Sequence, residues 1–342
     1  MQAPTDIRSD ARVLAALKNS MFVADIGGTN IRLGVVSLED PAELHAKVQV
    51  ECESEAEFAT AVREYLFQLG PSGPQVGALA VAGPKTSAGI DITNRPWGLT
   101  RQGLAERLGL RQVSLLNDLE AVAYAVGTGA VTALTAIQDV VSDGSNSLVV
   151  GVGTGLGLAA VRKEADCCDV VATEGGHSSL AYGDLSAEFY AASTARFGAA
   201  TGETYLSGPG LIRLYKVLCD THGTEPLELT PEELVANAES RLDSLEAKTL
   251  ETFFYLLGVF CSNVALVHGA RGGVYLVGGL LVRLAKQLQQ GDFVRGFLSV
   301  GNMQEYVRCI RVELVVDSHP GLKGAAIGAA AFRARNENSN EV

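Results

Sequence analysis

Short runs of aliphatic and β-branched residues alternate along this chain with longer segments in which apolar positions recur every three or four residues. The short runs predict strands, because each is bounded by glycine or by polar residues. We expect strands at FVADIG, IRLGVV, LVVGVG, LGLAAV, GGVYLVGG and IRVELVVD. The longer segments predict helices at residues 55–69, 119–126, 186–197, 231–238, 245–267 and 320–335. This alternation predicts an α/β fold.

Two segments of the chain, residues 21–37 and 146–162, share one pattern of strand, glycine-rich turn and strand. They read MFVADIGGTNIRLGVVS and NSLVVGVGTGLGLAAVR. A tight glycine turn between two strands can point its backbone amides at an anion without side chains intervening. The internal repeat therefore predicts two phosphate-binding turns, one in each of two domains.

The first turn follows a carboxylate, Asp25, and contains two glycines and the hydroxyl of Thr29. These groups are the ones that hold a magnesium-bound phosphate chain. The alternative is an ordinary hairpin with Gly-Gly at its turn. Because Asp precedes the glycines and Thr-Asn follows them, we favour the phosphate site.

The second turn is less specific, because glycine-rich turns are frequent. Gly155, Gly157 and Ala160 also fit the pattern of dinucleotide-binding proteins. That pattern requires the glycines to open a helix, whereas LGLAAVR continues as a strand. We therefore interpret this segment as a second phosphate turn and reject the dinucleotide site.

Polar residues follow an apolar strand abruptly at LLNDLE. Asn117, with Glu120 three residues later, is typical of a capping box at a helix N-terminus. Capping leaves Asp118 unassigned, at a position where a carboxylate would face a cleft between domains. Such an aspartate can accept the proton of an attacking sugar hydroxyl.

Further polar residues lie in turns. Glu174 and His177 flank two glycines, which we interpret as a flexible turn, and both side chains can hydrogen-bond vicinal hydroxyls. Asn94 and Glu203 are additional candidates, although simple turn chemistry also explains their positions.

Two other groups of glycines predict places where the backbone is closely approached. Gly278 and Gly279 end an apolar strand and can let a purine pack on the backbone, although alone they predict only a tight strand-to-helix turn. Gly321, Gly324 and Gly328 are spaced along an alanine-rich helix and can allow it to pack closely beside a domain hinge.

Composition narrows the class of protein. A chain of 342 residues with 47% hydrophobic residues and 38 glycines fits a compact enzyme of two domains. Its net charge of −12 disfavours binding to nucleic acid or to anionic membranes. The N-terminal segment lacks the apolar core of a secretory signal. The weakly polar run at residues 121–137 is too short to cross a membrane, and we interpret it as buried helix and strand. Six cysteines without CxxC spacing or a nearby histidine pair predict reduced thiols in a cytosolic protein and no zinc site.

In their order along the chain, these motifs resemble the bacterial-type glucokinase family, within the actin and hexokinase-like ATPase superfamily. DIGGTNIRL resembles its first phosphate motif, LLNDLEAVA its catalytic segment, GVGTGLG its second phosphate motif and VYLVGG its adenosine motif, while EGGH and LSGPGL resemble its sugar-site segments. The related repressor, open-reading-frame and kinase family typically adds a zinc-binding cysteine cluster, which this chain lacks after His177.

The resemblance covers nearly the whole chain and implies an α/β fold of two ribonuclease H-like, actin-like ATPase domains flanking a deep cleft. The small domain would comprise residues 1–128 and 317–342, and the large domain residues 129–316. Sugar binding would close the two domains.

The resemblance also implies a glucokinase that moves the γ-phosphoryl group of ATP to the 6-hydroxyl of glucose, with Asp118 as the general base. The implied sugar-binding residues are Asn94, Asn117, Glu174, His177 and Glu203. The implied ATP-binding residues are Ala24, Asp25, Ile26, Gly27, Gly28, Thr29, Gly153, Thr154, Gly155, Gly278 and Gly279. Asp25 would position Mg²⁺, usually through water. A cytoplasmic homodimer that feeds glycolysis is also implied.

Other functions stay open at this point. The sequence does not fix the sugar, because glucose, mannose and N-acetylglucosamine differ mainly at C2, and polyphosphate or ADP can replace ATP as donor. A non-catalytic sugar sensor would need a docking module, for which only about twenty residues precede the first expected strand. An actin-like filament ATPase would not require EGGH.

Overall fold

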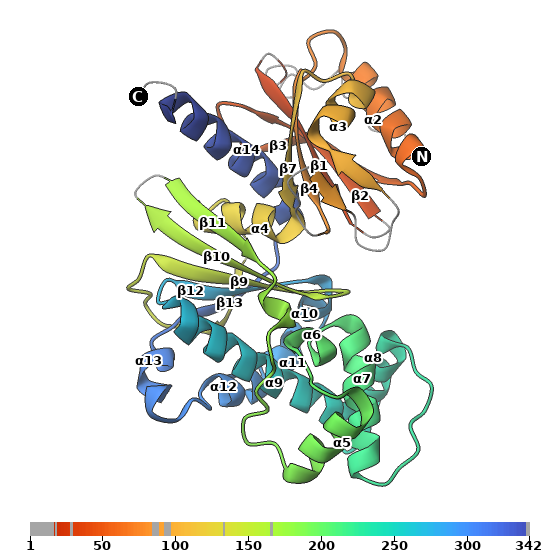
Figure 1. Ribbon diagram of the computed structural model, residues 1–342, viewed down its shortest axis with the longest axis vertical. Helices are drawn as coiled ribbons and strands as arrows, with labels where there is room; N and C mark the ends of the chain where they lie inside the picture. Colours follow the sequence, from red (N-terminus) through yellow and green to blue (C-terminus); the bar gives the residue numbers. More distant parts are fainter. Residues whose placement is uncertain are drawn as a thin grey trace. The chain divides into compact units, whose positions relative to one another are not determined.

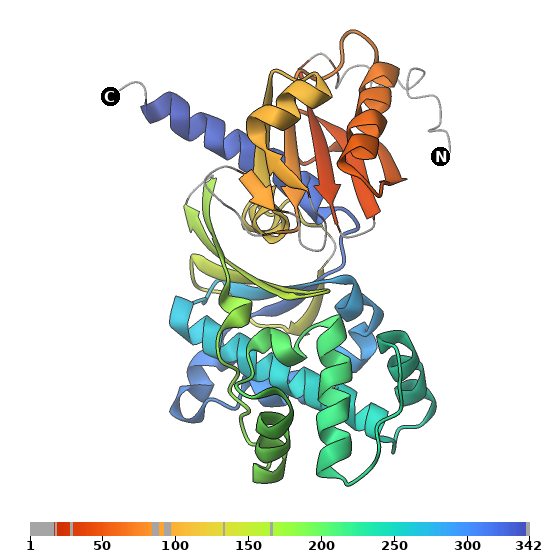
Figure 2. The ribbon, with the colours of Figure 1, turned by 45° about the vertical axis from the view of Figure 1, so that its right-hand side comes forward.

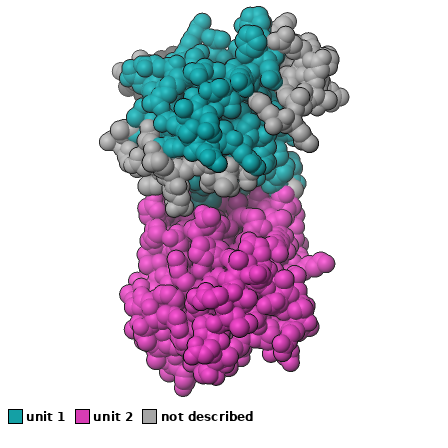
Figure 3. All heavy atoms as spheres, turned by 90° about the vertical axis from the view of Figure 1, so that its right-hand side faces the viewer, with its two compact units in different colours: residues 1–132, 165–170, 317–342 teal, residues 133–164, 171–316 magenta. Residues whose placement is uncertain are grey.

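The computed structural model (Figure 1) describes residues 17, 19–27, 30–83, 89–91, 97–132, 134–164 and 167–339. The chain divides into two compact units, coloured separately in Figure 3. Unit 1 comprises Met1–Thr132, Ala165–Val170 and Asp317–Val342, and unit 2 comprises Ala133–Glu164 and Val171–Val316. These units and the predicted domains group residues 129–132 and 165–170 differently, so the domain boundaries stay a prediction.

Unit 1 is built on a five-stranded sheet in the order β3-β2-β1-β4-β7. The strands are β1 (Ser20–Ile26), β2 (Asn30–Ser37), β3 (Leu44–Glu51), β4 (Val76–Val81) and β7 (Gln112–Asn117). The first three strands pair antiparallel, whereas β4 and β7 run parallel to β1. The carboxyl ends of β1, β4 and β7 therefore meet at one edge of the sheet. A short two-stranded sheet, β5 (Gly89–Asp91) with β6 (Gly98–Thr100), completes the strands described in this unit.

Helices cover both faces of this sheet (Figures 1 and 2). On one face lie α2 (Glu55–Leu69) and α3 (Arg101–Leu108), whose apolar residues pack on alternate side chains of β1, such as Phe22. On the other face lie α4 (Asp118–Gly127) and α14 (Pro320–Ser339), which pack against each other. The alternation of side chains along β1 places Asp25 on the face of α14.

Close packing of α14 on α4 depends on glycine, as the sequence predicted. A Cβ atom on Gly324 would overlap the carbonyl oxygen of Ala121, and one on Gly328 would overlap the side chains of Leu116 and Tyr124. The backbone of α14 therefore touches α4 directly, at positions where no larger residue fits.

A six-stranded sheet in the order β11-β10-β9-β12-β13-β8 repeats the strand order of unit 1, and its strands belong to unit 2 apart from residues 167–170 of β11. The strands are β8 (Leu134–Gln138), β9 (Asn146–Val152), β10 (Leu156–Glu164), β11 (Cys167–Thr173), β12 (Gly273–Val277) and β13 (Val312–Val315). The pair β9 and β10 is antiparallel, and β12 and β13 run parallel to β9, as β4 and β7 do to β1. The predicted hairpin repeat is therefore part of a repeated ribonuclease H-like sheet, to which β8 adds an antiparallel edge strand. The expectation that residues 121–137 are buried is wrong at β8, where Leu134 is 40% exposed.

The core of unit 2 is centred on α9 (Leu245–His268), a long helix that packs on β9 and on neighbouring helices. The other helices are α5 (Ala187–Phe197), α6 (Gly202–Tyr205), α7 (Gly208–Thr221), α8 (Pro231–Ser240), α10 (Gly279–Arg283), α11 (Ala285–Leu288), α12 (Asp292–Phe297) and α13 (Gln304–Arg308), with single 3-10 turns at Gly175–His177 and Gly301–Met303. Within the described ranges, α9 alone is long and apolar enough to cross a membrane, but 78% of its apolar window is buried inside the molecule. It is a core helix.

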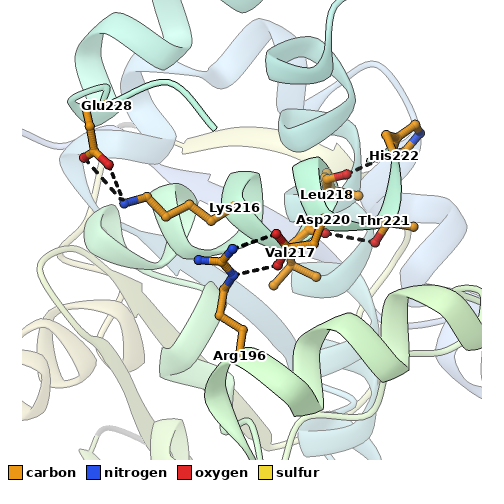
Figure 4. Close-up of polar contacts among 8 residues, drawn as sticks. All are labelled: Arg196, Lys216, Val217, Leu218, Asp220, Thr221, His222 and Glu228. Atoms are coloured by element: carbon orange, nitrogen blue, oxygen red, sulfur yellow. Dashed lines mark hydrogen bonds and ion pairs between the residues drawn. The ribbon is translucent and has the colours of Figure 1, made fainter. Parts of the chain in front are cut away.

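Polar contacts join α5 to the C-terminal part of α7 (Figure 4). Arg196 donates from Nε and Nη2 to the two carboxylate oxygens of Asp220, each at 2.6 Å. On α7, Lys216 pairs with Glu228 at 3.2 Å, and His222 donates from Nδ1 to the carbonyl of Leu218. Because Arg196 and Asp220 are each 34% exposed, we expect their pair to contribute at most about 1 kcal/mol to stability.

The cysteines whose side chains the structure describes are not paired. Cys52, Cys168, Cys219, Cys261 and Cys309 are all free thiols, as predicted, and only the last of these five is exposed. Burial raises the pKa of the Cys261 thiol, so this side chain is a neutral part of the core.

Candidate active site

The carboxyl edge of the unit 1 sheet brings two predicted site residues near each other. Asp25 of β1 pairs in register with Ala80 of β4, and Ala80 pairs with Leu116 of β7. Two strand spacings separate Asp25 from Leu116, which corresponds to about 10 Å. Asp118, at the start of α4, follows directly after β7, so both carboxylates lie at the same edge of the sheet.

Asp25 has a cationic partner on the neighbouring strand. The antiparallel register of the hairpin pairs Asp25 with Arg32, whose Nη1 donates to Oδ2 at 3.3 Å. Burial raises the pKa of Asp25, while the charges of Arg32 and His319 act in the opposite direction. No role for Arg32 was predicted from the sequence, although the register of a tight hairpin is a signal that places it opposite Asp25.

The surroundings of Asp25 fit a magnesium ion that is held mainly by substrate oxygens. The N-terminal turn of α14 presents Gly321 to this carboxyl group, where an added Cβ would lie 3.0 Å from Oδ2. In the part of the chain that the structure describes, no three His, Cys, Asp or Glu side chains gather into a metal cage. Mg²⁺ is usually bound by one or two carboxylates together with phosphate and water, so a single aspartate matches its needs.

The start of α4 contains the predicted capping box. Asn117 Oδ1 accepts hydrogen bonds from the amides of Leu119 and Glu120, and the Glu120 carboxylate accepts one from the Asn117 amide. The Asn117 side chain also donates from Nδ2 to the carbonyl of Gly83 at 3.0 Å. These bonds fix the orientation of the Asn117 side chain.

Asp118 is the first residue of α4 and directly follows the cap residue Asn117. Asp118 Oδ1 accepts a hydrogen bond from the amide of Leu119 at 2.8 Å. Burial raises the pKa of Asp118 to about 6, and the negative charge of Asp25 adds to this effect. The carboxylate is therefore ionised at neutral pH yet is a stronger base than an ordinary aspartate, which suits a proton acceptor.

In unit 2, the second glycine turn joins two strands, as predicted. Leu156 begins β10 directly after the glycines, which excludes the helix that a dinucleotide site requires. The amide of Gly153 donates to the carbonyl of Gly155 at 2.9 Å, and the amide of Gly208 donates to the carbonyl of Gly153 at 2.8 Å. Because the Gly153 amide is used within the turn, the amides of Thr154 and Gly155 are the candidate donors for an anion.

Glu203 lies against this turn. Its Oε2 accepts a hydrogen bond from the amide of Leu156 at 3.0 Å, and a Cβ on Gly155 would meet the same oxygen. Glu203 belongs to the short helix α6, which is distant from the turn in sequence. The structure thus brings a predicted sugar residue and a predicted phosphate turn together.

The segment EGGH also packs on Leu156. Residues Gly175–His177 form a 3-10 turn, and a Cβ on the buried Gly176 would overlap the carbonyl oxygen of Leu156. Our interpretation of a flexible turn is therefore wrong, because these glycines allow a close contact with β10. The side chains of Glu174 and His177 at the ends of this turn are exposed.

Gly278 and Gly279 lie beside the second glycine turn, which follows β9. In register, Val277 of β12 pairs with Gly151 of β9, and Gly278, at φ +139°, is so close to the carbonyl of Val152 that no side chain fits. Gly279 begins α10, which confirms the predicted strand-to-helix turn, and a Cβ there would meet nothing within 4 Å. The backbone at Gly279 is thus open to a ligand.

Other predicted site residues divide into two groups. Ala24 and Ile26 are fully buried in β1, so their side chains are not accessible to a ligand, and Gly27 directly follows this strand. Gly28, Thr29 and Asn94 lie outside the described residues.

Comparisons with known proteins point to one family. A family model described as Glucokinase matches residues 22–332. The chain is 34% identical over 310 residues to the glucokinase of Saccharophagus degradans, covering 89% of this chain and 96% of that protein. It is 30% identical to the crystal structure of a glucokinase from an Antarctic psychrotroph, with a TM-score of 0.81 and coverage of 91% of this chain and 98% of that one.

The similarity to a more distant solved structure supports the fold alone. The ROK family glucokinase from Streptomyces griseus, solved in complex with glucose and AMPPNP, is 18% identical, with a TM-score of 0.58 and coverage of 90% of this chain and 98% of that one. Its two ligands are a sugar and an analogue of ATP.

Proposed function

Since this chain belongs to the glucokinase family and is an enzyme that phosphorylates a hexose, we propose that it transfers the γ-phosphoryl group of ATP to the 6-hydroxyl of D-glucose. The match of the family model over residues 22–332 is the observation that carries this proposal. The glucose and AMPPNP bound to the Streptomyces griseus enzyme support the same pair of substrates.

Asp118 is the general base of the proposed reaction. It accepts the proton of the sugar 6-hydroxyl as the oxygen attacks the γ-phosphorus, the bond from that phosphorus to the β,γ-bridging oxygen breaks, and ADP leaves. A pKa of about 6 and a hydrogen bond from the Leu119 amide support this role, because the carboxylate is ionised, oriented and basic at neutral pH. Asp118 leads a helix whose cap is complete, so its backbone position is fixed.

In this proposal, the sugar hydroxyls are held by Asn117, Glu174, His177 and Glu203. The packing of Gly176 and of Glu203 on Leu156 supports this set, because it gives both sugar segments of unit 2 a common rigid support. Asn94 belongs to the proposed set through its place in the sequence alone.

Each of the two glycine turns is a proposed phosphate-binding element. In unit 2, the free amides of Thr154 and Gly155 donate to phosphate oxygens, Gly153 shapes the turn, and Gly278 and Gly279 give the adenosine a flat backbone surface. In unit 1, the segment from Ala24 to Thr29 supplies the first turn, and Asp25 holds Mg²⁺, usually through water. When bound, this ion neutralises charge on the phosphate oxygens.

The cellular setting completes the proposal. We place the enzyme in the cytoplasm as a homodimer that feeds glycolysis. The free, mostly buried thiols agree with a reducing compartment.

The deciding experiment is ADP release by the purified protein with MgATP and glucose, mannose, fructose or N-acetylglucosamine, and with no sugar as the control. We expect turnover with glucose that is much greater than with any other sugar. Turnover without sugar would indicate an ATPase, sugar binding without turnover a sensor, and preferred turnover of mannose or N-acetylglucosamine a different hexose kinase.

The pKa of Asp118 predicts the acid limb of the pH profile. Only the ionised carboxylate accepts a proton, so kcat should be constant above the pKa and should fall about tenfold per pH unit below a value near 6. We would measure kcat at saturating glucose and MgATP between about pH 5 and pH 8. A profile that stays flat through this range would remove Asp118 as the base.

A further inference from the structure

Unit 1 contains a pocket of about 670 Å³ at the edge of its sheet where the parallel strands begin. Ser20, the first residue of β1, and Val76, the first residue of β4, both line it, as does Arg111, which directly precedes β7. The proposed catalytic residues lie at the other end of these strands. From Ser20 to Asp25 the distance along β1 is about 16 Å.

The charge of this pocket is unusual for so acidic a chain. Its charged lining side chains are Arg111 and Arg333, and no Asp or Glu is among its described lining residues. The protein as a whole has 39 acidic and 27 basic residues. Ser72 and Gln75 add polar groups to the same walls. The lining is therefore suited to an anion.

Arg333 provides the second observation. Its Nε is buried and, among the described residues, has no hydrogen-bond partner. A buried guanidinium N–H without an acceptor is energetically unfavourable. Carboxylate and phosphate oxygens match the fork of N–H groups that arginine presents. Arg333 also lines the pocket, so an anionic group bound there would offset the charge of its guanidinium group.

We infer that this pocket is a binding site for a small organic anion bearing phosphate or carboxylate groups. Its volume lies in the range of metabolite sites, and the ligand it accepts is distinct from the sugar and nucleotide of the proposed reaction. The site faces away from the carboxyl edge of the sheet, so ligand bound there leaves Asp25 and Asp118 accessible.

The test uses 2-phosphoglycolate, which carries one phosphate and one carboxylate, and methyl NMR of the full chain labelled at Leu and Val. We expect saturable shift changes at Leu38 and Val76, which line the pocket. In the Arg111→Gln/Arg333→Gln variant the Kd should rise at least about tenfold, because two charged hydrogen-bond donors are lost. Arg101→Gln, an exposed arginine of unit 1 outside the pocket, is the matched control and should bind as the parent does.

Arg111→Gln alone keeps the test decisive if the double variant does not fold, because Arg111 is exposed and its loss should leave the fold intact. It should also raise the Kd. An equal Kd in all these proteins, or no saturable change at Leu38 and Val76, would overturn the inference. Changes confined to Val152 and Leu156 would also overturn it, because the probe would then occupy the glycine turn of unit 2. No catalytic step enters the measurement, so its result is separate from that of the kinase assay.

Discussion

Replacement of Asp118 by asparagine should lower kcat for glucose phosphorylation about 100- to 10,000-fold, while the affinity for glucose changes little. The amide keeps the shape of the side chain, and its oxygen can still accept the Leu119 amide, but it cannot take up the proton of the sugar hydroxyl. The measurement is steady-state kinetics together with direct glucose binding. Asp40→Asn, which removes an exposed carboxylate elsewhere in unit 1, is the matched control and should retain full activity.

The same substitution should stabilise the folded protein at neutral pH. The pKa of Asp118 is raised from 3.8 to about 6, so the folded state binds this proton more tightly than the unfolded chain does. That contribution to stability is complete below pH 3.8 and is lost as the pH rises through about 6. At pH 7 the neutral amide should therefore raise the free energy of unfolding by up to about 3 kcal/mol. An inactive variant that is also less stable would indicate a damaged fold, and an active one would remove Asp118 from the mechanism.

Gly324→Ala should destabilise unit 1 by about 3 kcal/mol, because the new Cβ would overlap the carbonyl oxygen of Ala121 and force α14 away from α4. For a unit of this size, that loss corresponds to a fall in Tm of about 6–12 °C. Scanning calorimetry is the suitable measurement, since two units can unfold in separate transitions.

Gly208→Ala is the matched control for this effect. Gly208 also lies in a helix, at the start of α7, but the nearest atom to an added Cβ is the carbonyl oxygen of Gly153 at 3.5 Å, an ordinary contact. This substitution should change Tm by no more than about 2 °C. If both variants melted at the same temperature, α14 would not pack on α4 through Gly324.

Much of the fold was predictable because local chemistry and global structure agree. The hairpins at Asp25 and Gly153 combine apolar strands with glycine turns, and the start of α4 carries a complete capping box. In contrast, no helix was predicted over α7, whose first three residues are Gly208, Pro209 and Gly210. Its actual signals are Ser207, which caps the helix, and Pro209 in its first turn.

The candidate site was predictable as a set of residue types and not as a set of contacts. Asp118 stood out because capping did not explain it. The contact of Glu203 with the Leu156 amide could not be foreseen, since 47 residues separate them and no local pattern brings them together. The packing of Gly176 on Leu156 could not be predicted for the same reason. The two adjacent glycines therefore suggested a flexible turn, whereas Gly176 is required by its close contact with Leu156.

The bond from Leu156 to Glu203 also has a thermodynamic meaning. The Glu203 carboxylate accepts a hydrogen bond from the amide of Leu156, the first residue of β10 after the second glycine turn. In the proposed enzyme it also accepts a hydrogen bond from a sugar hydroxyl. If sugar binding shifts the Glu203 carboxylate, Leu156 and the preceding amides of Thr154 and Gly155 should shift with it. By reciprocity, a nucleotide that reorders those amides must alter the affinity for sugar by the same factor. A single hydrogen bond would thus make the two dissociation constants interdependent.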